Sequence, residues 1–234
     1  MATRDVLAEL VAAFEDSSGR TVVLESVGGV HAAQRVRAGE RFDVIVLARD
    51  AIDGLAEAGH LRRGTLVDFA RSGVAVAVRA GAERPDIRDE EAVRRAVLGA
   101  RAIGTSTGPS GVALGRLFEQ WGIATEIRHR LVTPPPGIPV ADLIAGGRVD
   151  LGFQQLSELA RAPGVDVVGL LPSPIEIVTT FSAAIGATGP EADGAAELIA
   201  FLVSPAAADT KRRHGMEPAG EGEGTARRAA RRGP

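Results

Sequence analysis

The chain has 234 residues, of which 45% are apolar and 24% charged, as in an ordinary globular protein, and this length allows two lobes of about 100 residues each. A formal net charge of -3 gives no support for nucleic-acid binding, because phosphate recognition needs a clustered positive field. The absence of cysteine excludes disulfides, thiolate metal sites and a cysteine nucleophile. No apolar run approaches the roughly 20 residues of a membrane span, so we expect no membrane insertion.

The sequence alternates between apolar runs typical of buried strands and amphipathic stretches typical of helices. In chain order we first expect a helix over 2–15, a strand over 21–27, a helix over 30–38, a strand over 42–48, a helix from Asp50 or Ala51 to near Gly59, and a strand over 72–81. The pattern then restarts with a helix over 89–99, a strand over 100–106, a helix over 110–121, a strand over 130–132, a helix over 139–146, strands over 149–153, 165–171 and 175–185, and a last helix or helix pair over 191–213. This alternation favours an α/β fold. The segment 219–234, rich in Gly, Ala, Arg and Glu, is expected to be disordered.

The segment 105–111, Thr-Ser-Thr-Gly-Pro-Ser-Gly, joins a predicted strand to a predicted helix. Small hydroxyl residues and glycines leave backbone N–H groups uncovered at a helix start, where the helix dipole is positive. Ser106, Thr107, Ser110 and Gly111 are therefore candidate anion-binding residues. The alternative is a simple N-cap and tight turn, which needs only one serine. The helix that follows is expected to carry on its apolar side Val112, Leu114, Leu117, Phe118 and Trp121.

The segment Ser26–His31 repeats this arrangement in the first half of the chain. Here Gly28, Gly29 and Val30 would offer backbone donors, although the glycines could equally serve only to make the turn. Two such corners that faced each other would supply donors to one ligand. His31 stands beside this corner and is interpreted either as a hydrogen-bonding wall residue or as a general base.

Two adjacent glutamines, Gln154 and Gln155, follow the predicted strand 149–153. Neighbouring residues of a strand point to opposite faces, so at most one of the two amides should face a ligand. A glutamine amide donates to an oxyanion or a carboxylate without adding a charge. Surface amides that cap the following helix are the alternative. Pro136 and Gly137, in a proline-rich turn, complete the set of candidate ligand-binding residues.

The histidines predict neither a metal site nor a catalytic triad. The spacing typical of zinc ligands is absent among His31, His60, His129 and His214. No G-x-S-x-G motif is present, and no Ser–His–Asp set can be assembled. We therefore expect no metal and no cofactor.

The order of these motifs resembles that of the periplasmic molybdate-binding proteins of ABC transporters. The resemblance covers roughly residues 2–218. It rests on the segments FDVIVLARDAIDGLAEAGHL, SGVAVAVRAGA, STGPSGVALGRLFEQWGI, VDLGFQQLSEL, IEIVTTFSAAI and AAELIAFLVSPAAADTKRRHGMEP. The Phe-Gln-Gln-x-Ser-Glu-Leu sequence is also similar to a branch of this fold that includes aconitate isomerases.

The resemblance implies a two-lobed type II periplasmic-binding fold, with a mixed sheet in each lobe, helices on both faces and a hinge of two crossing strands. Residues 1–76 and 180–218 would form one lobe and residues 77–179 the other, with a small anion captured between them. It also implies ABC transporter membrane subunits as partners, a monomeric state and a periplasmic location. Because the first 25 residues lack an apolar signal core, a cytoplasmic location follows if Met1 is the true start.

Two departures from the family pattern bear on the ligand. The family begins with a strand and a serine-containing turn before its first helix, whereas this sequence starts at or just before that helix. Molybdate binders commonly have a tyrosine where Gln155 stands and a serine where Gly28 or Gly29 stands. Without these hydroxyl donors, the site would suit a planar carboxylate at least as well as molybdate.

Two functions of different classes therefore stay open. The first is a solute-binding protein that captures a molybdate-like oxyanion or an organic carboxylate for ABC-type transport. The alternative is an organic-acid isomerase that moves a proton along a tricarboxylate, with His31 as the base and Ser106, Ser110 and Gln155 holding carboxylates. A ligand-sensing regulatory domain is a third possibility.

Overall fold

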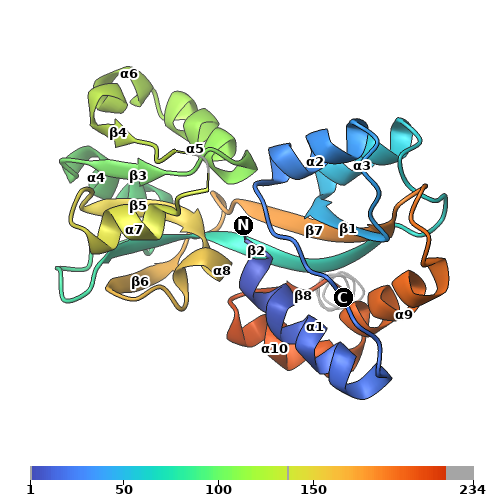
Figure 1. The fold of residues 1–234 in the computed structure, drawn as a ribbon. Coiled ribbons are helices and arrows are strands. Elements are labelled where there is room, and N and C mark those ends of the chain that lie inside the picture. Colours follow the sequence, from blue (N-terminus) through green and yellow to red (C-terminus); the bar gives the residue numbers. More distant parts are fainter. Residues whose placement is uncertain (1, 136, 220–234) are drawn as a thin grey trace, which may run out of the picture. The chain divides into compact units, whose positions relative to one another are not determined.

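The computed structural model describes residues 2–135 and 137–219, which divide into two compact units (Figure 1). Residues 3–71 and 180–219 belong to the first unit, and residues 72–179 form the second. The chain passes between the units twice, within strand β2 (Val67–Arg79) and within strand β7 (Val178–Ile185). The interpretation of these units as lobes that close on a ligand stays a prediction.

The first unit is built on a sheet in which β1 (Val44–Ala48) pairs antiparallel with β7. The register runs from Val44 opposite Ile185 to Ala48 opposite Phe181. Strand β7 lies next to β2, and the short β8 (Glu217–Pro218) pairs antiparallel with the start of β2.

Helices cover both faces of this sheet because its strands alternate in the side chains they present. Ile45 and Leu47 of β1 pack with residues of α2 and α3, whereas Val44 and Val46 pack with residues of α1 and α9 (Figure 1). The helices of this unit are α1 (Arg4–Ser18), α2 (Gly29–Arg37), α3 (Arg49–Glu57), α9 (Ala192–Val203), the 3-10 turn η2 (Pro205–Ala207) and α10 (Ala208–Arg213). The predicted amphipathic helix near the start is confirmed in α1, which ends at Gly19 with a φ of 69°.

The prediction of a buried strand over 21–27 is wrong. This segment has no strand pairing, and Val23 and Leu24 are 87% and 39% exposed. Side chains hold it instead: the backbone N–H of Val22 donates to Glu15, and Glu25 forms an ion pair with Arg35 at 2.7 Å. A β-branched, apolar run becomes a strand only where it pairs with a neighbouring strand, and the described residues show no such pairing for this segment.

The second unit has a mixed sheet. Strand β3 (Ile103–Thr105) pairs in parallel with β4 (Leu131–Val132) and β5 (Leu151–Gln155). The later part of β2 pairs antiparallel with β5 on one side and with β6 (Val165–Leu170) on the other. The mixed α/β sheet predicted from the sequence is therefore confirmed.

Two apolar clusters, one on each face of this sheet, form the core of the second unit. Val74 and Val76 pack with Phe153 and with α4, α5 and α6, whereas Ala75 and Ala77 pack with α7. The helices of this unit are α4 (Glu90–Gly99), α5 (Pro109–Gln120), α6 (Ala124–Ile127), the 3-10 turn η1 (Arg128–Arg130), α7 (Val140–Ala145) and α8 (Leu156–Leu159).

Besides the absent strand over 21–27, the structure differs from the sequence-based expectations in the exposure of one side chain and in two short helices. Val112, expected on the apolar side of α5, is 55% exposed, whereas Leu114 and Phe118 are buried as expected. The single-turn helices α6 and α8 were not expected, because four residues are too few to show a helical period. None of the described helices combines the length and the apolar character that crossing a membrane requires.

Candidate functional site

The corner between β3 and α5 is the best-defined candidate for anion binding. Strand β3 ends at Thr105, and α5 begins at Pro109, where the missing N–H of proline costs no helical hydrogen bond. Gly108 is the N-cap residue and has no side chain to cap the helix. The N–H groups of Thr107, Gly108 and Ser110 have no hydrogen-bond acceptor among the described residues. A helix of 12 residues thus begins with uncovered donors at its positive end.

Two serine hydroxyls frame this helix start. Ser106 Oγ and Ser110 Oγ are 3.0 Å apart, and Ser110 is only 7% exposed. When one hydroxyl donates to the other, a single hydroxyl hydrogen remains for an outside acceptor. The N-cap alternative needs a serine that accepts from the backbone of α5, and no such side-chain bond caps this helix.

Gly111 is required sterically at this corner. A Cβ atom at this position would lie 1.8 Å from the carbonyl oxygen of Ser106 and 2.8 Å from its carbonyl carbon. Both are backbone atoms, which cannot rotate away as the end of a side chain can. Glycine here therefore allows the segment that carries Ser106 to lie directly against the first turn of α5.

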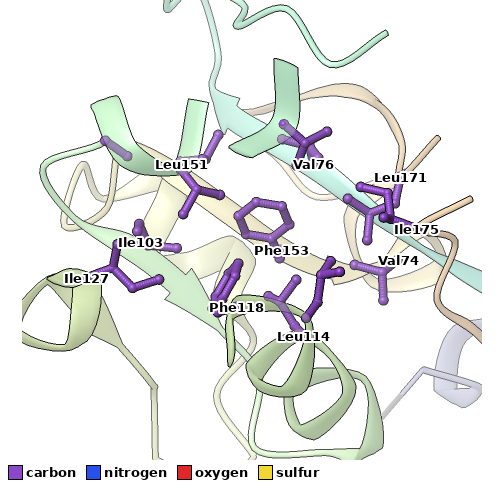
Figure 2. Packing of buried hydrophobic residues seen from close by; sticks show 14 of the residues in the cluster. Val74, Val76, Ile103, Leu114, Phe118, Ile127, Leu151, Phe153, Leu171 and Ile175 are labelled. Atoms are coloured by element: carbon purple, nitrogen blue, oxygen red, sulfur yellow. The ribbon is translucent and has the colours of Figure 1, made fainter. Parts of the chain in front are cut away.

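The two glutamines of β5 point to opposite faces of the sheet, as the strand period requires. Gln154 is 3% exposed, and its Oε1 accepts the backbone N–H of Ala141 at 3.2 Å, on the face covered by α7. Gln155 follows Phe153 by two residues and so shares its face, where Phe153 packs against Phe118 of α5 (Figure 2). The amide of Gln154 is thus committed to α7, and Gln155 lies on the α5 face.

Only one end of the Gln155 amide forms a hydrogen bond with the described residues. Its Nε2 donates to Thr179 Oγ1 at 2.6 Å, while its Oε1 is buried and has no hydrogen-bond partner among the described residues. The side chain as a whole is 4% exposed. Sequence reasoning did not single out Thr179, although two adjacent threonines inside a mostly apolar strand were a visible signal.

Strand direction brings several predicted residues to one edge of the second unit. Because β3, β4 and β5 are parallel, the residues after them lie together at their carboxyl ends, where α/β sheets bind ligands. Ser106, Thr107, Ser110, Gly111, Gln155 and Gly137 all belong to this edge. Thr133, which follows β4, is tied to Thr105 by a hydroxyl contact of 3.2 Å. Pro136 lies outside the described residues.

Asp150 fixes the other end of the same strands. Its carboxylate accepts the backbone N–H groups of Arg101 and Ala102 at 3.0 and 2.7 Å, just before β3. Burial favours the protonated acid, but these backbone hydrogen bonds prevail and lower the pKa of Asp150. The charged carboxylate therefore helps to set the register of β3 against β5, and with it the positions of Ser106 and Gln155.

The corner predicted at Ser26–His31 leads into α2 in the first unit. Gly28 is the N-cap residue, and neither Gly28 nor Gly29 has a positive φ. A Cβ atom would meet nothing within 4 Å at Gly28 and only Leu47 at 3.8 Å at Gly29. The turn therefore does not require glycine at either position. An effect of both glycines is to leave the backbone donors at the start of α2 uncovered.

The side chains around this second corner are exposed. Val30 is 70% exposed, and His31, in the first turn of α2, is also exposed. Arg35 lies on the same helix, but hydrogen bonds to Glu40 and to Glu25 raise its pKa and compensate its charge. Whether His31 and the donors of α2 contact a ligand stays a prediction.

Two cavities in the described residues lie apart from these corners. One of about 420 Å³ in the second unit is lined by Glu90, Ala113, Arg116, Leu117, Gln120 and Pro174–Ile177. One of about 80 Å³ in the first unit is lined by Val36, Gly39, Glu40, Phe42, Ile45, Gly59, His60 and Gly186–Thr188. Neither is lined by a predicted site residue. No group of His, Asp and Glu in the described ranges could hold a metal ion.

Solved structures with the same fold include binding proteins for oxyanions. The chain superposes with a TM-score of 0.77 on the periplasmic molybdate-binding protein of Azotobacter vinelandii, at 20% identity over 92% of this chain and 95% of that one. The sulfate-binding protein of Mycobacterium tuberculosis gives a TM-score of 0.73 at 18% identity, over 98% of this chain and 88% of that one. These likenesses show the type II periplasmic-binding fold.

Comparison of sequences gives the family. An aconitate isomerase from a Pseudomonas species is 34% identical over 187 residues, which are 79% of this chain and 70% of the relative. The model of the family described as bacterial extracellular solute-binding protein matches residues 1–217. With this match over nearly the whole chain, the protein is a member of the bacterial extracellular solute-binding protein family.

Proposed function

We propose that the protein binds a small organic acid and that the carboxyl edge of the second unit holds one of its carboxylates. The observation that carries this proposal is the set of uncovered N–H groups beside the Ser106–Ser110 hydroxyl pair at the start of α5. These groups are all neutral hydrogen-bond formers, and none contributes a charged side chain. Neutral donors at a helix start stabilise an anion without an ion pair.

A carboxylate suits this edge better than a tetrahedral oxyanion. The uncovered backbone N–H groups at the start of α5 match a planar carboxylate, and two of the hydroxyl donors expected in molybdate binders have no counterpart here. The relative with 34% identity is named for aconitate, a tricarboxylate. The molybdate-binding neighbours are at most 20% identical and so support the fold only.

Family membership implies a small solute as the ligand and an ABC transporter as the partner. We extend the proposal to delivery of the acid to such a transporter from the periplasm, by a monomeric protein. We also propose, as expected from the sequence, that the corner at Gly28–His31 binds the same ligand.

Binding is tested by isothermal titration and by thermal denaturation with citrate, tricarballylate, malate, succinate, both aconitates, molybdate and sulfate. We expect at least one carboxylate to bind in the micromolar range and to raise the melting temperature, with molybdate and sulfate weaker. Ser110→Ala should weaken binding about ten-fold, as expected for one lost hydrogen bond to a charged group. Tight binding of molybdate without any carboxylate binding would refute the proposed ligand class.

A second candidate function, isomerisation of aconitate, is favoured by the 34% identical relative. In this reaction a base removes a proton from the methylene carbon, the double bond shifts, and a proton is returned to the former vinyl carbon. His31 is the candidate base, with Ser106, Ser110 and Gln155 holding carboxylates. Purified protein incubated with cis-aconitate and followed by chromatography should then form the trans isomer, and His31→Ala should abolish this turnover. Binding of aconitate without turnover leaves the solute-binding function.

A further inference from the structure

The amide of Gln155 presents two chemically different ends, of which only one is occupied. Its NH₂ end donates to Thr179 Oγ1 at 2.6 Å. Its carbonyl oxygen is shielded from solvent and accepts no hydrogen bond from the described residues. The neighbouring Gln154 differs, because its carbonyl oxygen accepts the N–H of Ala141. Of these two equally buried glutamines, Gln155 alone has an unsatisfied acceptor in the described structure.

A ligand that brings a hydrogen-bond donor to an unsatisfied buried acceptor binds more tightly, because a new hydrogen bond forms. A carbonyl oxygen without a partner loses its hydration and gains nothing in return, so a new O–H donor meets a group already desolvated. A fully deprotonated oxyanion brings only further acceptors, which the same oxygen repels. The polarity of this one atom therefore discriminates between ligands of similar size and charge.

We propose that Gln155, oriented by Thr179, selects a carboxylic acid that also carries a hydroxyl group. This inference rests on the proposed function and names its substrate class: a hydroxy acid whose carboxylate binds the Ser106–Ser110 corner and whose hydroxyl donates to Gln155 Oε1. Thr179 accepts from the NH₂ end and so keeps the carbonyl end available. It is a positioning residue for this subsite.

Two features of the site support the assignment. Gln155 shares the sheet face of Phe153, which packs on α5, so it lies on the same face as the helix that starts at the serine corner. Gln155 is also opposite Val74 in the antiparallel ladder, and Val74 packs with Leu114 of the same helix in one cluster. Because the oxygen is shielded, the ligand reaches it only after a local rearrangement, and association should be slower than diffusion.

The test uses pairs of acids that differ by one hydroxyl: citrate with tricarballylate, and malate with succinate. Isothermal titration of the wild-type protein should show the hydroxy acid of at least one pair binding about ten-fold tighter, as expected for one gained hydrogen bond in a buried site. In Gln155→Met, which keeps the length of the side chain but removes its amide, the two members of each pair should bind equally. Gln154→Met is the matched control and should keep the preference.

The role of Thr179 is tested separately. Thr179→Val should reduce the preference for the hydroxy acid, and Thr179→Ser, which keeps the hydroxyl, should restore it. Circular dichroism of each variant establishes that it is folded.

The outcomes separate this inference from the proposed function. Equal binding of the paired acids by the wild-type protein, or equally tight binding of an aconitate, overturns the hydroxyl selection and leaves carboxylate binding intact. A preference for tricarballylate or succinate that disappears in Gln155→Met also overturns the hydroxyl selection. Such a result would mean that the amide of Gln155 presents its NH₂ group, and not its carbonyl oxygen, to the ligand. Failure of every acid to bind refutes the proposed function itself.

Discussion

The ring of Phe153 in β5 meets the ring of Phe118 in α5 nearly edge-on, with centroids 6.2 Å apart and an interplanar angle of 77° (Figure 2). Phe118 is 1% exposed and Phe153 is 2% exposed. This contact joins the strand that ends in Gln155 to the helix that starts beside Ser110. Packing of the core thereby sets the spacing between two parts of the candidate site.

Phe118→Ala is expected to destabilise the protein by about 3–5 kcal/mol, because it removes the transfer energy of a buried ring and leaves a cavity. Trp121, the single tryptophan, has its ring 6.0 Å from that of Phe118 and so reports on this unit. Urea unfolding followed by tryptophan fluorescence measures the change. Phe118→Leu, whose side chain fills more of the space than alanine does, should lose clearly less stability. Equal losses for the two variants would contradict the packing argument.

Gly111→Ala is expected to abolish binding of the acid, because the new Cβ would lie 1.8 Å from the carbonyl oxygen of Ser106 and force the corner apart. Gly115→Ala is the matched control on the same helix, since a Cβ there meets nothing within 4 Å. The control should keep full affinity and gain up to about 1 kcal/mol of stability from the better helix propensity of alanine. Isothermal titration and thermal denaturation measure both effects. Unchanged affinity in Gly111→Ala would show that the corner is not part of the site.

Asp68→Ala is expected to cost about 1–3 kcal/mol, because it leaves the fully buried hydroxyl of Ser182 without its acceptor. One oxygen of Asp68 accepts from Ser182 Oγ at 2.7 Å and from Arg49 at 2.8 Å, and so ties β2 to β7 and to the start of α3. Asp53→Ala is the control, since it breaks only the exposed ion pair of Asp53 with Arg49 and should cost about 0.3–0.5 kcal/mol. Chemical denaturation followed by circular dichroism compares the two. A loss of stability in Asp68→Ala no larger than that in Asp53→Ala would show that Asp68 does not hold these three elements together.

Glu9 should make stability depend on acid pH. Hydrogen bonds from His214, at 2.8 Å, and from Arg213 lower the pKa of Glu9 from 4.5 to about 2. A carboxyl whose pKa is lower in the folded state stabilises that state fully above pH 4.5, and this contribution is lost as the pH falls toward 2. Because the Glu9 side chain is 40% exposed, solvent screening reduces the contribution to about 1 kcal/mol.

Thermal denaturation of Glu9→Gln between pH 7 and pH 2 tests this linkage. The variant should melt about 2–4 °C below the wild-type protein at pH 7, and the difference should vanish near pH 2. Glu197→Gln, which removes the exposed pair of Glu197 with Arg20, should show a smaller difference. A difference for Glu9→Gln that stays constant across this range would exclude a titrating carboxylate as its source.

Local periodicity determined most of the secondary structure and the composition of the candidate corners. Helix α1 was predictable because five apolar residues recur at helical spacing, and all five are buried. The helix start after Ser106–Gly108 was predictable because glycine, proline and serine have strong local preferences at such positions. These signals act over a few residues and need no knowledge of the rest of the chain.

The tertiary structure decided what depends on partners far apart in sequence. The run 21–27 had the composition of a strand, yet it forms none, because a strand needs a neighbouring edge that its own residues cannot supply. The alternation of β5 required Gln154 and Gln155 to point apart, but only the packing of Phe153 on Phe118 decided which one lies on the α5 face. The bond from Gln155 to Thr179 joins residues 24 positions apart, and no local pattern encodes it. Sequence periodicity predicts which side chains share a face of a strand or helix, whereas only the assembled sheet and helices determine which groups those side chains contact.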